Sequence, residues 1–128
     1  MSKTITISDE QYKEIKDKIQ EKKEKGVTIY HRNGSVLFET NQDTIRKAAE
    51  EKKYNLSGSN LSGSNLSGSN LSGSDLSDSD LSGSNLRGSN LRSSDFFHAL
   101  FFGRGGTTKI KKSQVDDFFK ALGVIVEE

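Results

Sequence analysis

The sequence contains no cysteine and only two histidines. Without cysteine the chain forms no disulfide and has no thiol chemistry, which is compatible with a reducing cytoplasm, the location that we expect. His31 and His98 have no companion cysteine and no HxH or HxxxH spacing, so the sequence predicts no metal site. Serine is abundant, but no serine is paired with a base in a pattern that would identify a nucleophile triad. We therefore predict no catalytic residue, no cofactor and no enzyme activity.

A long hydrophobic run and an excess of charge of either sign are also missing. The N-terminus becomes polar by Ser8, so the sequence predicts neither a signal peptide nor a membrane span. The 19 Lys and Arg residues and the 18 Asp and Glu residues leave a formal net charge of +1. Between residues 54 and 103, two basic and four acidic residues give a net charge of −2. Arg87 and Arg92 are the basic residues there, so we expect no nucleic-acid partner and no membrane partner.

Between Tyr54 and Gly103 the chain repeats every five residues. Four NLSGS units begin at Asn55, and the units DLSDS, DLSGS, NLRGS, NLRSS and DFFHA follow. Internal repeats determine the architecture of a chain, so this segment decides the fold class. Every fifth residue is large and apolar, and these residues form one column: Leu56, Leu61, Leu66, Leu71, Leu76, Leu81, Leu86, Leu91, Phe96 and Phe101.

A five-residue period fits neither an α-helix, with apolar residues three and four apart, nor a flat strand, with apolar residues two apart. A flexible linker is the alternative for a segment rich in Ser, Gly and Asn. A linker, however, has no reason to carry a large apolar residue at every fifth position. We predict a solenoid that turns a corner at each repeat, where glycine takes a positive φ. The candidate corner glycines are Gly58, Gly63, Gly68, Gly73, Gly83 and Gly88.

The motif of a small residue, Asp or Asn, Leu or Phe, and two variable residues resembles that of the pentapeptide-repeat family. The resemblance implies a mainly β fold, a right-handed quadrilateral β-helix with one repeat per side and about 2.5 coils for ten repeats. The Leu and Phe column would point inward, and Tyr54, in place of the first small residue, would contact a cap. An inward hydroxyl needs a backbone carbonyl partner. The second inward column, two positions before the first, would be Ser59, Ser64, Ser69, Ser74, Ser79, Ser84, Ser89, Ser94 and Ala99.

So short a coil has two open ends, which need covers. We assign residues 1–53 to an N-terminal α/β cap, residues 54–103 to the β-helix and residues 104–128 to a C-terminal helical cap. Residues 3–7 alternate in polarity and predict a short strand.

A helix is predicted after this strand. Ser8 and Gln11 have the spacing of a capping box, and Gly26 ends the helix. Lys and Glu alternate on its other faces, which is typical of a solvated surface. Its apolar stripe consists of Tyr12, Ile15 and Ile19.

Residues 27–40 predict a β-hairpin, because Asn33-Gly34 favours a two-residue type I′ turn. Asn41 or Asp43 would then cap a helix that runs to about Lys53. The hairpin and helix resemble the N-terminal segment of a bacterial and bacteriophage variant of the pentapeptide-repeat family, where they would close the first coil. The predicted pairs are Ile29 with Phe38, Tyr30 with Leu37 and His31 with Val36; the helix face would carry Ile45, Ala48 and Ala49.

The repeats end in an aromatic run over residues 96–102. This run is either a hydrophobic plug at the end of the core or a dimer interface, since exposed aromatic patches mark association sites. Phe97 and Phe102 are the candidate interface residues. Ser113 is expected to cap a helix through Leu122, and residues 124–126 predict a last strand. This segment resembles the C-terminal cap of the same variant.

Two further motifs have alternative interpretations. Asp75, Asp78 and Asp80 cluster within one side and corner of the coil, but calcium requires six or more oxygen ligands at fixed geometry. We prefer a solvated corner. The GRGG segment, residues 103–106, lacks the lysine of a phosphate-binding loop and is expected to be a linker to the cap.

We predict a non-catalytic scaffold or protein-interaction module with an unassigned protein partner, either monomeric or dimeric through its C-terminal end. One alternative is a DNA mimic that modulates a type II topoisomerase, as the family resemblance implies, although a net charge of −2 over so short a coil is a poor copy of DNA. The other alternative is binding to a regular lattice such as ice through outward serine rows, in which Ser57 stacks on Ser77 and Ser62 on Ser82.

Overall fold

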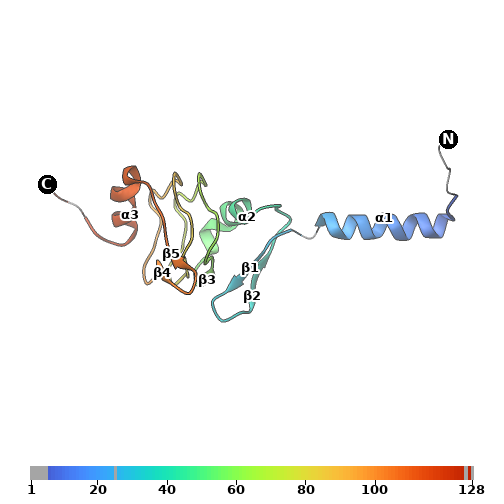
Figure 1. The fold of residues 1–128 in the computed structure, drawn as a ribbon, viewed down its shortest axis with the longest axis horizontal. Helices are drawn as coiled ribbons and strands as arrows, with labels where there is room; N and C mark the ends of the chain where they lie inside the picture. The colour runs from blue at the N-terminus through green and yellow to red at the C-terminus, as the bar shows by residue number, and fades with distance from the viewer. Residues whose placement is uncertain (1–5, 25, 126, 128) are drawn as a thin grey trace.

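The computed structural model describes residues 6–24, 26–125 and 127. Along the long axis of the molecule, α1 (Asp9–Glu24) stands at one end (Figure 1). A hairpin and α2 (Ile45–Lys52) come next, and stacked turns of the chain form the middle. The short helix α3 (Val115–Ala121) lies at the opposite end of these turns.

The capping box predicted at the start of α1 is confirmed. The Gln11 N–H donates to Ser8 Oγ at 3.1 Å, and the Ser8 N–H donates to Gln11 Oε1 at 2.9 Å. Of the predicted strand over residues 3–7, residues 3–5 lie outside the described residues, and Thr6 and Ile7 form no strand. Figure 1 shows α1 extending away from the rest of the molecule, so it is the hairpin and α2 that lie on the first repeats.

The hairpin consists of β1 (Thr28–His31) and β2 (Val36–Glu39). Because β1 also pairs with β3 (Ser59–Asn60), the sheet order is β2-β1-β3, and the hairpin is joined directly to the first repeats. Ile29 lies opposite Phe38, as predicted, but the register then shifts at a bulge. Tyr30 lies opposite Val36, so the predicted pairs Tyr30–Leu37 and His31–Val36 are wrong.

The turn between β1 and β2 explains the shifted register. The Gly34 N–H donates to the His31 carbonyl at 2.9 Å, and the His31 N–H donates to the Ser35 carbonyl at 2.8 Å, so the loop is longer than two residues. Gly34 has a φ of 93°, but Asn33 is outside the left-handed region that a type I′ turn requires at both central positions. Asn33 Oδ1 instead accepts the Ser35 N–H at 2.9 Å. The predicted type I′ turn is therefore wrong.

Thr44 caps α2, because its side chain accepts the Lys47 N–H at 3.2 Å. The predicted caps, Asn41 and Asp43, are wrong. A 3-10 turn, η1 (Lys53–Asn55), connects α2 to the repeats. Ala48 and Ala49 are buried in the core, which they share with the leucine column.

The repeats bond to one another with an offset of twenty residues, which is four repeats. Parallel bridges join Asn60 to Asp80, and further pairs with the same offset follow up to Asp80 and Leu100. The Leu61 N–H donates to the Asp80 carbonyl at 2.8 Å, and the Asp80 N–H donates to the Ser59 carbonyl at 2.9 Å. Between residues 56 and 100 of the described chain, β3 is the single strand and the other pairings are isolated bridges, so the β structure is less continuous than the mainly β fold that we predicted.

Each of the first nine repeats contains a turn whose fourth residue has a positive φ, as predicted for the corner glycines. These glycines have φ between 66° and 74°. Three repeats without glycine place Asp78, Ser93 and His98 in the same conformation, with φ of 57° to 59°. The backbone of each repeat therefore keeps one shape even where the residue is unfavourable for it.

A short hairpin of β4 (Phe102–Gly103) and β5 (Gly106–Thr107) interrupts the repeats. Asn85 is bridged to Lys109, an offset of 24 residues and not the 20 of the other pairs. The hairpin accommodates the four additional residues. The 3-10 turn η2 (Lys112–Gln114) leads into α3, which corrects the prediction that Ser113 caps a helix through Leu122. Of the strand predicted over residues 124–126, residues 124 and 125 form no strand and residue 126 lies outside the described residues.

Candidate functional site

The large inward column forms the centre of the core. The eight leucines from Leu56 to Leu91 and Phe96 are at most 1% exposed. Phe101, the last member, is partly buried and packs edge-on against Phe96, with ring centroids 5.4 Å apart. Phe118 of α3 lies 4.9 Å from Phe101 and 5.6 Å from Phe96, which closes the column with three aromatic rings.

The small column is less uniform. Seven of its serines are buried, whereas Ser64 and Ala99 are partly exposed. Four hydroxyls donate to the leucine carbonyl three residues earlier at 2.5 to 2.6 Å: those of Ser69, Ser79, Ser89 and Ser94. Three buried hydroxyls have no hydrogen-bond partner: those of Ser59, Ser74 and Ser84. The expected carbonyl partner is therefore present at some repeats and missing at others.

The outward Asn and Asp side chains accept hydrogen bonds from residues of their own repeats. Asn60 Oδ1 accepts the N–H of Ser62 at 3.1 Å and its hydroxyl at 2.7 Å, and the following repeats show the same arrangement. Asp75 and Asp80 accept in the same way from the serines two residues on. Asp78 instead lies 3.6 Å from Nδ1 of exposed His98. Across the described part of the chain, no three His, Cys, Asp or Glu side chains are grouped to hold a metal ion.

The N-terminal end of the coil is closed by hydrogen bonds from the hairpin and α2. Glu50 Oε2 accepts the Asn70 N–H at 2.8 Å, and the Lys53 carbonyl accepts the Asp75 N–H at 2.8 Å. From the hairpin, Arg32 Nη1 donates to the Asp78 carbonyl at 3.0 Å. His31 lies over Gly58, where a Cβ would meet its imidazole ring. These contacts occupy backbone groups that would otherwise be an open edge.

Tyr54, for which the sequence suggested a cap contact, is 65% exposed. The ammonium group of Lys53 lies 5.2 Å from the centre of its ring. One edge of the ring approaches Gly73. The side chain therefore lies along the outer surface of the coil, one turn above Gly73.

Gln114 closes the opposite end and was missed by the sequence analysis. It is 7% exposed, and its Nε2 donates to the carbonyls of Leu86 at 2.7 Å and Ser89 at 2.8 Å. Its Oε1 accepts the N–H groups of Gly88 at 2.8 Å and Lys111 at 2.7 Å. One side chain thus satisfies four backbone groups at the last turn. A single glutamine before a helix forms no recognisable sequence pattern, so its role at this end could not be predicted from the sequence.

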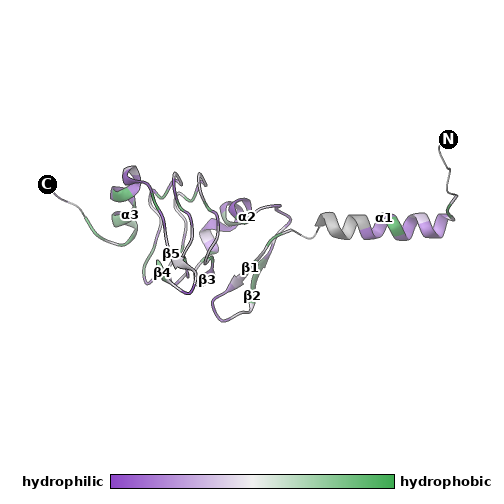
Figure 2. Ribbon diagram, in the orientation of Figure 1, coloured by the Kyte–Doolittle hydropathy of each residue, from purple (hydrophilic) through white to green (hydrophobic). Residues whose placement is uncertain are grey.

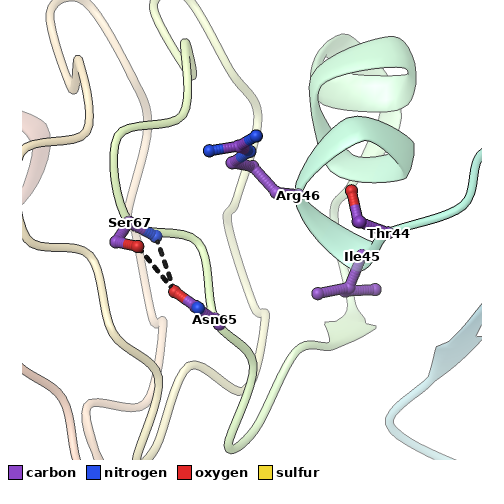
Figure 3. Close-up of a pocket in the computed structure, with 5 residues that line it drawn as sticks. All are labelled: Thr44, Ile45, Arg46, Asn65 and Ser67. Carbon is purple, nitrogen blue, oxygen red and sulfur yellow. Dashed lines mark hydrogen bonds between the residues drawn. The ribbon is translucent and has the colours of Figure 1, made fainter.

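A shallow groove of about 330 Å³ lies between the start of α2 and the third repeat. Figure 3 shows Arg46 reaching from α2 toward the coil, while Asn65 is already bonded to the backbone and hydroxyl of Ser67. Thr44 is used as the cap of α2. Arg46 is thus the one charged lining residue, and the groove offers no acid–base pair for catalysis.

The two candidate interface residues lie on the outer surface of the last repeats. Phe97 is 60% exposed and Phe102 is 77% exposed. Phe97 stacks on His98, with ring centroids 3.9 Å apart, and lines a groove of about 280 Å³ beside α3. Phe102 does not line this groove and belongs to the hairpin of β4 and β5.

Within the part of the chain that is described, no helix is both long and apolar enough to cross a membrane.

Comparison with protein families identifies the repeats. Residues 55–99 match the family model described as pentapeptide repeats, in eight copies. No curated protein and no solved structure matches the chain.

Proposed function

Since the repeats of this chain belong to the pentapeptide-repeat family, we propose that it acts as a non-catalytic scaffold that binds proteins. Repeat proteins usually bind through extended and regular surfaces. We propose further that a second copy of the chain docks at the C-terminal end of the repeats, around Phe97 and Phe102. The protein partner of the remaining surface is unassigned.

The main support for this proposal is the outward position directly after each residue of the large inward column. It holds serine in the first six repeats, Arg87 and Arg92 in the next two, and Phe97 and Phe102 in the last two. The repeat fold therefore does not require an aromatic residue there. Two largely exposed phenylalanines at such a position favour a binding role, because aromatic residues are enriched at protein interfaces.

The outward serine rows favour a scaffold over the two alternatives. The hydroxyls of Ser62, Ser67 and Ser72 donate to the asparagine of their own repeat. Ser57 and Ser77, one turn apart, hydrogen-bond to each other at 3.0 Å. Hydroxyls that already have partners are less available to order a lattice such as ice. A segment with a net charge of −2 also offers little of the regular charge that a DNA mimic requires.

We also infer that the repeats close into a right-handed quadrilateral β-helix of about 2.5 coils. The twenty-residue offset of the parallel bridges supports four sides per coil. One turn with positive φ in each of the first nine repeats supports a corner at every fifth residue. The regular stacking of these corners would hold the outward rows at fixed spacing, as a scaffold requires.

Light scattering coupled to size-exclusion chromatography tests the proposed interface. We expect the wild-type chain to form a dimer that dissociates in Phe97→Ser and Phe102→Ser. Serine is the residue of the first six repeats, so both variants are expected to fold and to keep the wild-type melting temperature. Arg92→Ser, at the same position one repeat earlier, is the matched control and should remain dimeric. A wild-type monomer at all concentrations would contradict the dimer.

A further inference from the structure

α1 carries apolar residues that are largely exposed in the described part of the chain. Tyr12 and Ile15 lie on one face of this helix and are 59% and 50% exposed. In the coloured part of α1, Figure 2 shows a hydrophobic segment between hydrophilic ones, at a distance from the coil. In proteins, most helical stability comes from packing an apolar face against another surface. A partner surface would therefore stabilise α1.

Charge is segregated around this face. At about 100° per residue, Lys16 and Lys18 flank the apolar pair, one on each side. The Lys18 ammonium lies 3.8 Å from the Glu14 carboxylate, but both side chains are about 70% exposed and the pair contributes little. The side of the helix opposite the apolar face is mainly acidic, with Glu10, Glu14 and Asp17 beside one lysine, Lys13.

We propose that α1 docks against an amphipathic helix of a partner protein whose apolar stripe is bordered by Glu or Asp. Tyr12 and Ile15 have the spacing of the a and d positions of a heptad, and Ile19 continues this pattern in the sequence. Lys16 and Lys18 then occupy e and g positions, where charges of opposite sign determine the choice of partner. This inference goes beyond the proposed dimer, because it concerns another surface and another partner.

Two other occupants fit this face less well. A second copy of α1 would place Lys16 and Lys18 next to the same lysines, and like charges at e and g positions disfavour pairing. An anionic lipid surface would attract these lysines, but interfacial helices bury a broad apolar face. Tyr12 and Ile15 form a narrow stripe, which matches the seam between two helices.

Two synthetic peptides of about three heptads test the proposal, both with leucine at a and d. One has glutamate at e and g, and the matched peptide has lysine there. We expect the acidic peptide to shift the amide resonances of residues 9–24 in the full chain and to leave those of the repeats unchanged. The lysine peptide should cause no shift. Ile15→Ser, or Lys16→Glu with Lys18→Glu, should weaken binding about tenfold or more.

Asp17→Asn, on the opposite side of α1, is the control and should bind as the wild type does. Equal binding of both peptides, binding of neither, or shifts confined to the repeats would overturn the proposal. So would shifts produced by phosphatidylserine vesicles and not by the acidic peptide, which would identify a lipid surface. A dimer lost in Ile15→Ser and kept in Phe97→Ser would identify a second copy. The proposed C-terminal dimer is measured separately by light scattering, so the two proposals fail independently.

Discussion

Ser59 and Ser79 lie in adjacent turns of the coil and in the same inward column, yet their hydroxyls differ in hydrogen bonding. Ser79 Oγ donates to the Leu76 carbonyl at 2.6 Å, whereas Ser59 Oγ has no partner. Both side chains are fully buried. A buried hydroxyl without a partner costs about 1–3 kcal/mol, so two positions with the same residue contribute differently to stability.

Alanine substitution should therefore have opposite effects along this column. We expect Ser59→Ala and Ser84→Ala to raise the free energy of unfolding by about 1 kcal/mol, because each removes an unpartnered polar group and leaves the small volume filled. Ser79→Ala, the matched variant, should lower it by about 0.5–1.5 kcal/mol, because a hydrogen bond is lost. Urea denaturation of the three variants measures these differences. Equal effects at all three positions would show that the unpartnered hydroxyls carry no penalty.

The closure of the last turn depends on one side chain. Gln114→Ala removes the partner of three backbone groups: the N–H of Gly88, the N–H of Lys111 and the carbonyl of Ser89. The Leu86 carbonyl still accepts the N–H and the hydroxyl of Ser89. With about 1–3 kcal/mol for each group left buried and unpaired, we expect the free energy of unfolding to fall by at least about 2 kcal/mol. The neighbouring exposed Lys112→Ala is the control and should change it by less than about 0.5 kcal/mol. A wild-type melting curve for Gln114→Ala would mean that water replaces these bonds without cost.

The five-residue period picked out nine large apolar residues that are buried, from Leu56 to Phe96, and the glycines that have a positive φ. Both follow from a repeated local conformation, and Gly63 and Gly68 accordingly have the same φ of 66°. The hydrogen bonding of the inward hydroxyls was not predictable, because Ser64 and Ser69 stand in identical repeats and yet differ in burial. Their surroundings differ through the turns above and below, which are distant in sequence.

The ends of the coil were less predictable than its middle. Asn33-Gly34 correctly indicated a hairpin, but the side chain of Asn33 bonds to Ser35 and a longer loop replaces the expected turn. The hairpin inserted before Lys109 and the hydrogen bonds of Gln114 depend on where the last turn of the repeats ends. The repeat pattern in the sequence does not indicate that position. Individual contacts of this kind can be predicted only when the three-dimensional arrangement of the caps is known.

Glycine-to-alanine substitution should separate backbone strain from steric clash. Gly63 has a φ of 66° and open space around its Cα, so Gly63→Ala should cost about 1–2 kcal/mol through the left-handed conformation alone. Gly83 has a φ of 70°, and a Cβ there would collide with the Gly105 carbonyl of the β4–β5 hairpin. We therefore expect Gly83→Ala to lower the melting temperature clearly more than Gly63→Ala. Gly63→Asn, which tolerates this conformation better, should be milder than Gly63→Ala.

The two parts of the N-terminal region should differ in their importance for folding. Because α1 extends away from the coil, a chain that lacks residues 1–25 should keep the wild-type melting temperature and the wild-type oligomeric state by light scattering. A chain that lacks residues 1–53 also loses the pairing of β1 with β3 and the bonds that Glu50 and Lys53 make to the N–H groups of Asn70 and Asp75. It further loses Ala48 and Ala49, which cover the core, so we expect aggregates or oligomers on size-exclusion chromatography. A folded monomer without residues 1–53 would show that the repeats need no N-terminal cover, and the hairpin and α2 would then be free to serve as a binding surface.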